Sequence, residues 1–151
     1  MGINYRLSGK NIYLDANIFI YLLEGYAEFI PLLEQLFSKI DSGILYGITS
    51  ELTLAETLVK PIADNNIVLQ KIYEDTIQTS KPLYVAPIAR NILTAAAKLR
   101  TNMIRLPDAI HLATAHLHSC HVFLTNDKRL KASSHMNVIL LSDIKNSTLT
   151  L

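Results

Sequence analysis

The sequence predicts an α/β fold in which helices cover both faces of a mostly parallel β-sheet. Short apolar, β-prone runs alternate with amphipathic helical patterns along the whole chain, which is typical of parallel strands joined by crossover helices. The 151 residues are 50% hydrophobic and 18% charged, as in ordinary globular domains. No internal repeat, low-complexity tract or linker interrupts the pattern, so residues 1–151 are interpreted as a single α/β/α sandwich domain.

The first half of the chain contains two strand patterns and four helix patterns. Helix ends are predicted from glycines, from a serine or asparagine able to cap a helix, and from a proline that should break one. In chain order, we expect a strand over 11–14, a helix from Ile18 to about Gly25, a helix from Pro31 to Gly43, a strand over 44–48, a helix capped by Ser50 and broken at Pro61, and a helix capped by Asn65 or Asn66 that reaches about Ile77.

The second half of the chain continues the alternation. Pro107 suits the first turn of a helix, because proline has no amide hydrogen to leave unpaired there. In chain order, we expect an extended segment over 82–85, a helix from Pro87 to about Arg100, a helix from Pro107 to Leu117, a strand over 122–124, a short polar turn of helix, and a strand over 138–141.

The net charge of +1 conceals an asymmetry between the two halves of the chain. Residues 1–75 contain five basic and ten acidic side chains, whereas residues 76–151 contain nine basic and three acidic ones. A basic C-terminal half is compatible with a polyanionic ligand, because Lys and Arg contacts to phosphates supply most sequence-independent affinity for nucleic acids. On charge alone, an ordinary solvated charge pattern is the alternative.

Cysteine content and hydropathy predict the compartment. The single cysteine, Cys120, excludes an internal disulfide, suits a reducing cytosol and is expected in the core. We find no signal-peptide pattern at the N-terminus, and no apolar run approaches the roughly 20 residues that span a bilayer. We therefore expect a soluble, cytoplasmic protein without a membrane partner.

Two of the expected strands lead into an aspartate. Asp15 follows the strand Ile12–Leu14, and Asp127 closes the segment Thr125–Asp127 after the strand at 122–124. In parallel α/β sheets, ligands bind beyond the carboxyl ends of the strands, where the strand order reverses. Both acids are therefore expected at one edge of the sheet, although Asp15 taken alone could simply cap the next helix.

Two further acids lie beside apolar helical positions. Asp108 begins a helix rich in Ala, Ile and Leu, where a favourable interaction with the helix dipole could alone explain an acid. Glu56 borders an expected buried stripe formed by Leu52, Ala55 and Val59. Four acids beside core elements predict a single cluster.

A cluster of four carboxylates requires neutralisation. Two like charges about 5 Å apart repel by roughly 3 kcal/mol at an effective dielectric of 20. Either some acids become protonated or divalent cations bind, and a set of oxygen ligands favours Mg²⁺ or Mn²⁺ over zinc. Mg²⁺ retains water molecules and binds through a few carboxylates together with substrate phosphates, which suits phosphodiester hydrolysis.

Four segments resemble the motifs of the PIN domain family, and in particular those of the VapC toxins of bacterial and archaeal toxin–antitoxin pairs. Each segment alone is weakly diagnostic, but the ordered set is specific and extends over about residues 10–142. The segments are Leu14–Phe19, Thr49–Glu56, Leu106–Ala115 and Phe123–Asp127.

The resemblance implies a PIN-like α/β/α sandwich, Mg²⁺- or Mn²⁺-dependent endoribonuclease activity on RNA, and a VapB-like antitoxin that blocks the site. The implied catalytic residues, which would ligate metal directly or through water, are Asp15, Glu56, Asp108 and Asp127. Asp15→Asn is accordingly expected to remove most of the activity, to preserve the fold and to relieve charge repulsion.

Further residues follow from the same resemblance. Asn17, Thr125 and Asn126 would support the ligands or contact the substrate, although relatives often have Arg at the position of Asn126. The candidates for contacts to RNA phosphates are Lys128, Arg129 and Lys131, with Arg100 and Arg105 as weaker ones.

The sequence argues against several other classes of protein. The five glycines form neither a dinucleotide fingerprint nor a phosphate-binding loop, and Asn17 stands where an aspartate-dependent phosphatase commonly has its second Asp. Histidines 111, 116, 118 and 121 suggest zinc, but no further ligands with metal spacing accompany them, so a surface or lightly buried position is expected. A catalytically silent PIN-like module that binds RNA or protein, and a DNA nuclease, remain open alternatives.

Large apolar side chains crowd the region around the first two helices. Helical geometry cannot turn all of them towards one sheet, so part of the group is expected to form an exposed patch; a helix pair packed into the core is the alternative. The residues are Tyr21, Leu22, Leu23, Tyr26, Phe29 and Leu33. Because VapC toxins form homodimers and bind antitoxin along such helices, the resemblance implies a homodimer and an antitoxin segment that directs an Arg or Lys towards the acids.

Overall fold

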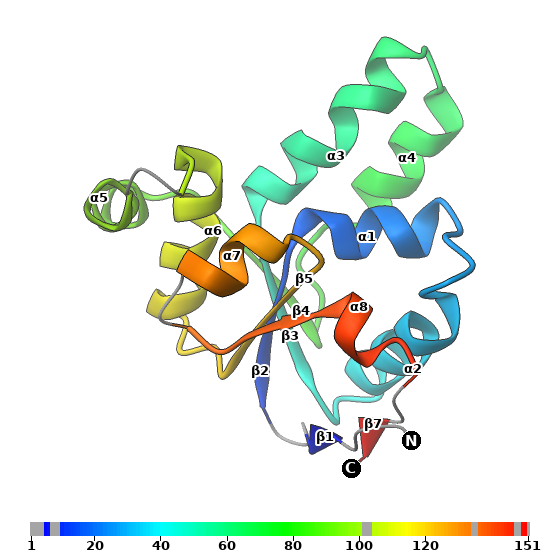
Figure 1. Ribbon diagram of the computed structural model, residues 1–151. Helices are drawn as coiled ribbons and strands as arrows, with labels where there is room; N and C mark the ends of the chain where they lie inside the picture. Colours follow the sequence, from blue (N-terminus) through cyan, green and yellow to red (C-terminus); the bar gives the residue numbers. More distant parts are fainter. Residues whose placement is uncertain (1–4, 7–9, 101–103, 134–135, 147–148, 151) are drawn as a thin grey trace.

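The centre of the fold is a five-stranded sheet in which every strand is parallel to its neighbours. The computed structural model describes residues 5–6, 10–100, 104–133, 136–146 and 149–150. The strands of the central sheet are β2 (Asn11–Leu14), β3 (Tyr46–Ser50), β4 (Leu83–Ala86), β5 (Val122–Thr125) and β6 (Val138–Leu140). Their spatial order is β4-β3-β2-β5-β6, which confirms the predicted α/β fold with its largely parallel sheet (Figure 1).

Helices lie on both faces of this sheet. They are α1 (Ala16–Leu23), α2 (Ile30–Asp41), α3 (Glu51–Ala63), α4 (Ile67–Thr76), α5 (Arg90–Leu99), α6 (Leu106–Leu117), α7 (Lys128–Ser133) and α8 (Leu141–Ile144). A short parallel pair, β1 (Tyr5–Arg6) with β7 (Leu149–Thr150), lies near the two chain ends (Figure 1).

Side-chain alternation along the strands divides the core into two layers. In β2, Ile12 and Leu14 belong to a layer that includes buried residues of α1, α2, α4 and α8. Tyr13 points to the opposite layer, which is formed with α5, α6 and α7. Because successive strand residues face opposite sides, this short apolar strand contributes to both cores.

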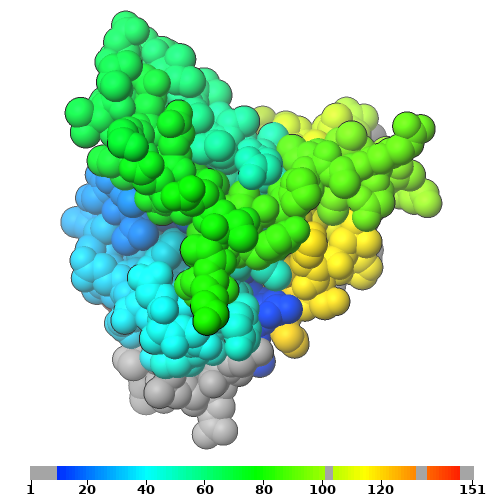
Figure 2. Space-filling model, turned by 180° about the vertical axis from the view of Figure 1, so that it is seen from behind, coloured from blue at the N-terminus to red at the C-terminus, as the bar shows by residue number. Residues whose placement is uncertain are grey.

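Helices α3 and α4 pack together as an arm that extends beyond the sheet (Figure 1) and forms the projection at the upper left of Figure 2. The sequence predicted a break at Pro61, but α3 continues through it to Ala63. Proline lacks the amide hydrogen that α3 would use at that position. The last turn is completed instead by hydrogen bonds from Asp64 N to Lys60 O and from Asn66 N to Pro61 O.

The buried face of α3 also differs from the prediction. Val59, expected in the buried stripe, is 67% exposed, and the buried positions are Thr53, Thr57 and Pro61. The threonine hydroxyls are accommodated there because they are paired: Thr49 and Thr53 share a hydrogen bond of 2.7 Å, and Thr57 donates to Leu54 O. Hydrogen-bonded hydroxyls can occupy interior positions that unpaired ones cannot.

Most other boundaries agree with the prediction within a few residues. Strand β3 begins at Tyr46 rather than at 44, because the amides of Ile44 and Leu45 still bond to Lys39 O at the end of α2. Helix α5 begins at Arg90 instead of Pro87, since Ala89 is in an extended conformation. Gly43 has a φ of +78°, which explains why α2 ends before it. None of the helices in the described ranges has the length and apolar character required to cross a membrane.

Candidate active site at the carboxyl edge of the sheet

Asp15 and Asp127 lie where the strand order reverses. Strands β2 and β5 are neighbours, and the chain proceeds from β2 towards β4 on one side and from β5 to β6 on the other. Asp15 directly follows β2, and Asp127 is two residues beyond the end of β5. Ligands of parallel α/β sheets bind at such a switch point.

Both carboxylate oxygens of Asp15 accept hydrogen bonds. Oδ1 accepts from Ala16 N at 2.8 Å, so Asp15 is the N-cap of α1, as the capping alternative predicted. Oδ2 accepts from the Thr125 hydroxyl at 2.7 Å. The residue is only 7% exposed, so these bonds hold the carboxylate in a fixed place between β2 and β5.

Asn17 and Thr125 form the support behind the acids. Thr125 Oγ1 accepts from Asn17 Nδ2 and from Asp127 N, both at 3.1 Å, while it donates to Asp15. Asn17 Oδ1 in turn accepts from Asn126 N. This network joins the first turn of α1 to the end of β5, and thereby fixes the positions of Asp15 and Asp127 relative to each other.

Asp108 occupies the first turn of α6 and lies in the electrostatic field of the other acids. Partial burial raises the pKa of its carboxyl above the usual value, and the charges of Asp15 and Asp127 raise it further. Arg105, 4.0 Å away, partly offsets this effect. Three of the four predicted acids are therefore close enough to influence one another.

Asp127 is paired with a cation from α7, the helix that follows it. Arg129 donates from Nε to Oδ1 at 3.0 Å and from Nη2 to Oδ2 at 2.6 Å, and its backbone N–H also donates to Oδ1. These hydrogen bonds, only partly opposed by burial, lower the pKa of Asp127. Arg129, predicted to contact RNA phosphates, is engaged by this acid in the structure.

Glu56 reaches the edge of the site from α3 and is bound by a residue that the sequence analysis did not assign to it. His111 Nε2 lies 2.5 Å from Glu56 Oε1, and His111 Nδ1 lies 2.6 Å from the Tyr13 hydroxyl. The prediction of a surface or lightly buried histidine is wrong for His111, which is 1% exposed. Its place inside the apolar run Ala109–Ala115 was the signal available in the sequence.

The remaining predicted residues lie around this centre. Asn126 Oδ1 accepts hydrogen bonds from the Ser142 backbone N–H at 3.0 Å and from the Ser142 hydroxyl at 2.7 Å, so its side chain connects the end of β5 to α8. Lys131 forms an exposed ion pair with Asp143 at 2.9 Å. Lys128 is exposed and has no ion pair with an acid in the described part of the chain. Cys120, expected in the core, is only half-buried, and desolvation raises its thiol pKa to about 12.

The donor set fits a hard divalent cation chemically, because it consists of carboxylates with an excess of negative charge at Asp15 and Asp108. Within the described residues, however, no three Asp, Glu, His or Cys side chains are grouped closely enough to hold one ion. Two of the acids are instead in contact with other side chains, Glu56 with His111 and Asp127 with Arg129.

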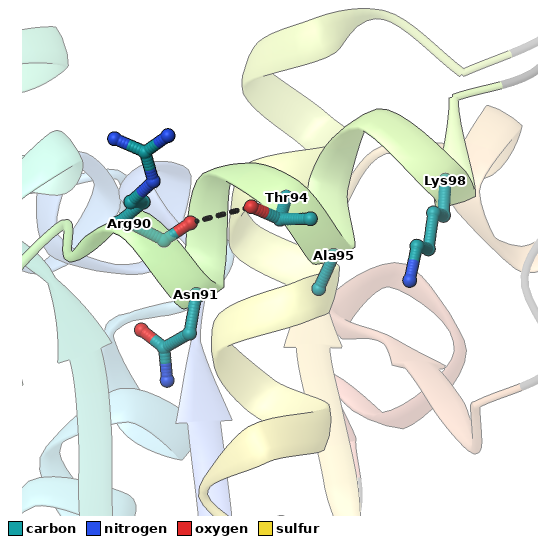
Figure 3. Close-up of a pocket in the computed structure, with 5 residues that line it drawn as sticks. All are labelled: Arg90, Asn91, Thr94, Ala95 and Lys98. Carbon is teal, nitrogen blue, oxygen red and sulfur yellow. Dashed lines mark hydrogen bonds between the residues drawn. The ribbon is translucent and has the colours of Figure 1, made fainter.

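A surface hollow of about 440 Å³ lies along α5, away from the four acids. Its polar lining residues are Arg90, Asn91, Thr94 and Lys98, and Thr94 donates a hydrogen bond to Arg90 O (Figure 3). No motif in the sequence predicts a role for this face. Two of the nine basic side chains of the C-terminal half, Arg90 and Lys98, are exposed on this face.

The exposed apolar surface differs from the predicted patch. Tyr26 is 46% exposed, whereas Phe29 and Leu33 are buried. Tyr21 is half-buried, with its ring stacked on Phe29 at 4.9 Å. A larger group, which we call the arm patch, lies on α3 and α4 and comprises Val59, Ile62, Ile67, Val68 and Ile72.

The fold and the site together define an α/β protein with acids gathered at the switch point of a parallel sheet. Residues 12–135 match the sequence model of the PIN domain, and the chain therefore belongs to the PIN domain family, whose members are generally nucleases. No curated protein sequence matches the chain significantly.

Several solved structures share this fold. VapBC2 from Rickettsia felis, bound to a DNA fragment of its promoter, has a TM-score of 0.66 at 15% identity and covers 86% of this chain and 98% of its own. A toxin–antitoxin complex from Klebsiella pneumoniae has a TM-score of 0.62 at 23% identity, covering 85% and 95%. VapC20 from Mycobacterium tuberculosis, described as a toxin that cleaves the sarcin–ricin loop, has a TM-score of 0.63 at 16% identity, covering 82% and 95%.

Proposed function

We propose that this protein is a metal-dependent endoribonuclease that hydrolyses RNA phosphodiester bonds and acts as the toxin of a VapBC-type pair. One observation carries the proposal: in a chain of the PIN domain family, Asp15, Asp108 and Asp127 share one electrostatic environment at the switch point of the sheet. The sarcin–ricin loop activity described for VapC20 supports RNA rather than DNA as the substrate class.

Asp15 and Asp108, together with Asp127 and Glu56 directly or through water, would hold Mg²⁺ or Mn²⁺. Such a cation, when bound, activates water for in-line attack on phosphorus and stabilises the charge on the leaving oxygen. The protein itself fixes the position of a ligand: the Thr125 hydroxyl and the Ala16 amide hold the Asp15 carboxylate in place before any cation binds. A site fixed in advance requires less reorganisation during the reaction.

Lys128 is the best placed of the predicted RNA contacts, because it is exposed at the start of α7 directly after Asp127. Arg129 would have to exchange Asp127 for a phosphate, and Lys131 would have to leave Asp143. Arg90 and Lys98 on α5 offer a second group of cations along which a longer RNA could extend.

We further propose a homodimer and a VapB-like antitoxin as protein partners. Tyr26 is exposed beside the first two helices, which the resemblance assigns to antitoxin binding. The arm patch exposes further large apolar side chains on α3 and α4, with Ile67 and Val68 at 70% and 72% exposure. Large exposed apolar groups of this kind commonly mark partner surfaces. Light scattering at tens of micromolar, with and without the product of a short neighbouring open reading frame, tests both partners.

The function is tested by RNA cleavage with Mg²⁺ or Mn²⁺, with excess EDTA, and with the Asp15→Asn variant. Asp41→Asn is the matched control, because Asp41 is an exposed acid at the far end of α2. We expect cleavage by the wild type and the control, and none with EDTA or Asp15→Asn. Full activity in EDTA would contradict the mechanism, and preferential cleavage of single-stranded DNA would contradict the substrate.

A catalytically silent PIN-like module is the second candidate, and one observation favours it. Two of the four acids are occupied by His111 and Arg129, and the described residues contain no three-donor group for a cation. RNA binding without cleavage at any tested concentration of Mg²⁺ or Mn²⁺ would establish this candidate instead.

A further inference from the structure

A buried chain of polar side chains connects the central sheet to Glu56. The Tyr13 hydroxyl lies 2.6 Å from His111 Nδ1, and His111 Nε2 lies 2.5 Å from Glu56 Oε1. Tyr13 and His111 are 0% and 1% exposed, among the apolar residues of the layer formed with α5, α6 and α7. Polar groups at this depth are stable only when they are hydrogen-bonded, so the contacts define one geometry.

The chemistry of the partners fixes the direction of the bond to Glu56. An ionised carboxylate can only accept hydrogen bonds, so His111 Nε2 must carry the proton that it donates to Glu56. The Tyr13 hydroxyl occupies the other ring nitrogen and prevents the imidazole from turning. The Tyr13 ring is itself held by stacking on Phe123, with ring centroids 4.9 Å apart.

The same edge of the imidazole faces a second acid. His111 Nε2 is 3.8 Å from Asp15 Oδ1, so one nitrogen lies beside carboxylates that come from the end of β2 and from α3. Asp108 is three residues before His111 on α6, at a spacing that brings side chains to one side of a helix. Helix α6 therefore contributes one acid of the site, Asp108, and also His111, which lies beside two others, Glu56 and Asp15.

We propose that His111, oriented by Tyr13, is a positioning residue that holds Glu56 beside Asp15 before metal binds. This inference rests on the proposed function, since it concerns the assembly of the same carboxylates. His111 engages only Oε1; no hydrogen bond reaches Oε2 from the residues that the structure describes, so this oxygen stays available to a cation or its water.

The hydrogen bond from His111 restricts the otherwise flexible side chain of Glu56. Glu56 is attached to an arm that projects from the sheet, and its side chain is 36% exposed. A glutamate in that setting would otherwise lose rotamer freedom when it joins the other ligands. Partners behind metal ligands commonly influence metal affinity in this way.

The test is metal binding in the absence of RNA, measured by calorimetry with Mn²⁺ alone. His111→Leu removes the donor, His111→Gln keeps an N–H donor near the position of Nε2, and Tyr13→Phe removes only the hydroxyl that orients the ring. Tyr46→Phe is the matched control, because Tyr46 is 48% exposed on the neighbouring strand. Thermal unfolding of each variant establishes that it is folded.

We expect His111→Leu to weaken Mn²⁺ binding by about 10–100-fold, the range found when a partner behind a metal ligand is lost. His111→Gln should recover part of this loss, Tyr13→Phe should weaken binding less than His111→Leu, and Tyr46→Phe should bind like the wild type. In ¹⁵N spectra of the metal-free protein, the His111 Nε2–H signal should shift in Glu56→Ala, and the Nδ1 signal should shift in Tyr13→Phe.

Two results overturn the inference and are distinguishable. If the wild type binds Mn²⁺ while His111→Leu and Tyr13→Phe bind it equally well or more tightly, His111 does not position a ligand, and the proposed function stands. If the wild type itself fails to bind Mn²⁺, the metal-dependent function fails together with the inference. Should His111→Leu not fold, Tyr13→Phe alone decides the question.

Discussion

The substitution Asp15→Asn combines a test of stability with a test of activity. Both oxygens of Asp15 are used, by Ala16 N and by the Thr125 hydroxyl. In the variant, one oxygen becomes an NH₂ group. Thr125 Oγ1 cannot accept from it, because Asn17 Nδ2 and Asp127 N already occupy its two acceptor positions. At least one hydrogen bond is therefore lost, whichever way the new amide is turned.

The magnitude follows from this lost bond. A buried group left without its partner costs about 1–3 kcal/mol. The charge effects have opposite signs, because Asp15 is repelled by Asp108 and lies 3.8 Å from the imidazole of His111. We expect the two charge effects largely to cancel, so that Asp15→Asn lowers the free energy of unfolding by about 1–3 kcal/mol. Each kcal/mol corresponds to a decrease in Tm of roughly 2–4 °C. Charge repulsion alone would predict that Asp15→Asn stabilises the protein; the loss of a buried hydrogen bond predicts the opposite.

The assay is thermal unfolding in EDTA, followed by RNA cleavage with Mg²⁺. Cleavage should fall by at least about 100-fold, the scale on which the loss of one fixed electrostatic group acts. Thr125→Val removes the same hydrogen bond from the other side, so the double variant should lose less stability than the two single variants together. A higher Tm for Asp15→Asn, or fully additive losses, would refute the hydrogen-bond reasoning, and unchanged cleavage would refute the assignment of the site.

Three further predictions address neighbouring residues. The pKa of Asp108 is raised in the folded state, so its protonation stabilises the fold below the unfolded-state pKa, and this stabilisation is lost as the pH rises through the folded-state pKa. Asp108→Asn should therefore raise Tm at pH 7, and thermal melts should show that this increase shrinks towards pH 4. Asn126→Ala should cost about 1 kcal/mol through loss of the Ser142 contacts, measured by urea unfolding, without changing the salt dependence of RNA binding. Lys128→Ala, in the Asp15→Asn background, should reduce the slope of log affinity against log salt by about 0.7 for single-stranded RNA, whereas Lys81→Ala should not; equal slopes would remove Lys128 from the RNA surface.

The predictions from sequence succeeded where the relevant physics is local. The alternation of apolar strands and helices determines a parallel sheet, since strands covered on both faces must be apolar throughout. Asp15 directly follows β2 and Asp127 comes two residues after β5, which places both at the carboxyl edge. The cap at Ser50, and a cap at Asn65 or Asn66, were predictable for the same reason, because a cap involves only the next two or three residues; the structure has Asn66.

The predictions failed where an assignment depends on partners distant in sequence. Val59 was placed in the buried stripe of α3 on hydrophobicity, yet the face against the core carries Thr53 and Thr57. Thr53 pairs there with the Thr49 hydroxyl of β3, and Thr57 donates to the Leu54 carbonyl of the preceding turn. Helical periodicity indicates that a helix has two faces. Which face is buried depends on what packs against it.

The sequence by itself therefore determined the fold class, the edge of the sheet at which acids gather, and the family resemblance, since these follow from periodicity and from short ordered motifs. Only the tertiary structure decided how the acids are held. Tyr13, Glu56 and His111 come from β2, α3 and α6, and their contacts span 98 and 55 positions of the chain. Their hydrogen bonds exist because the fold brings these elements within about 3 Å of one another, and spacing along one chain cannot encode that approach.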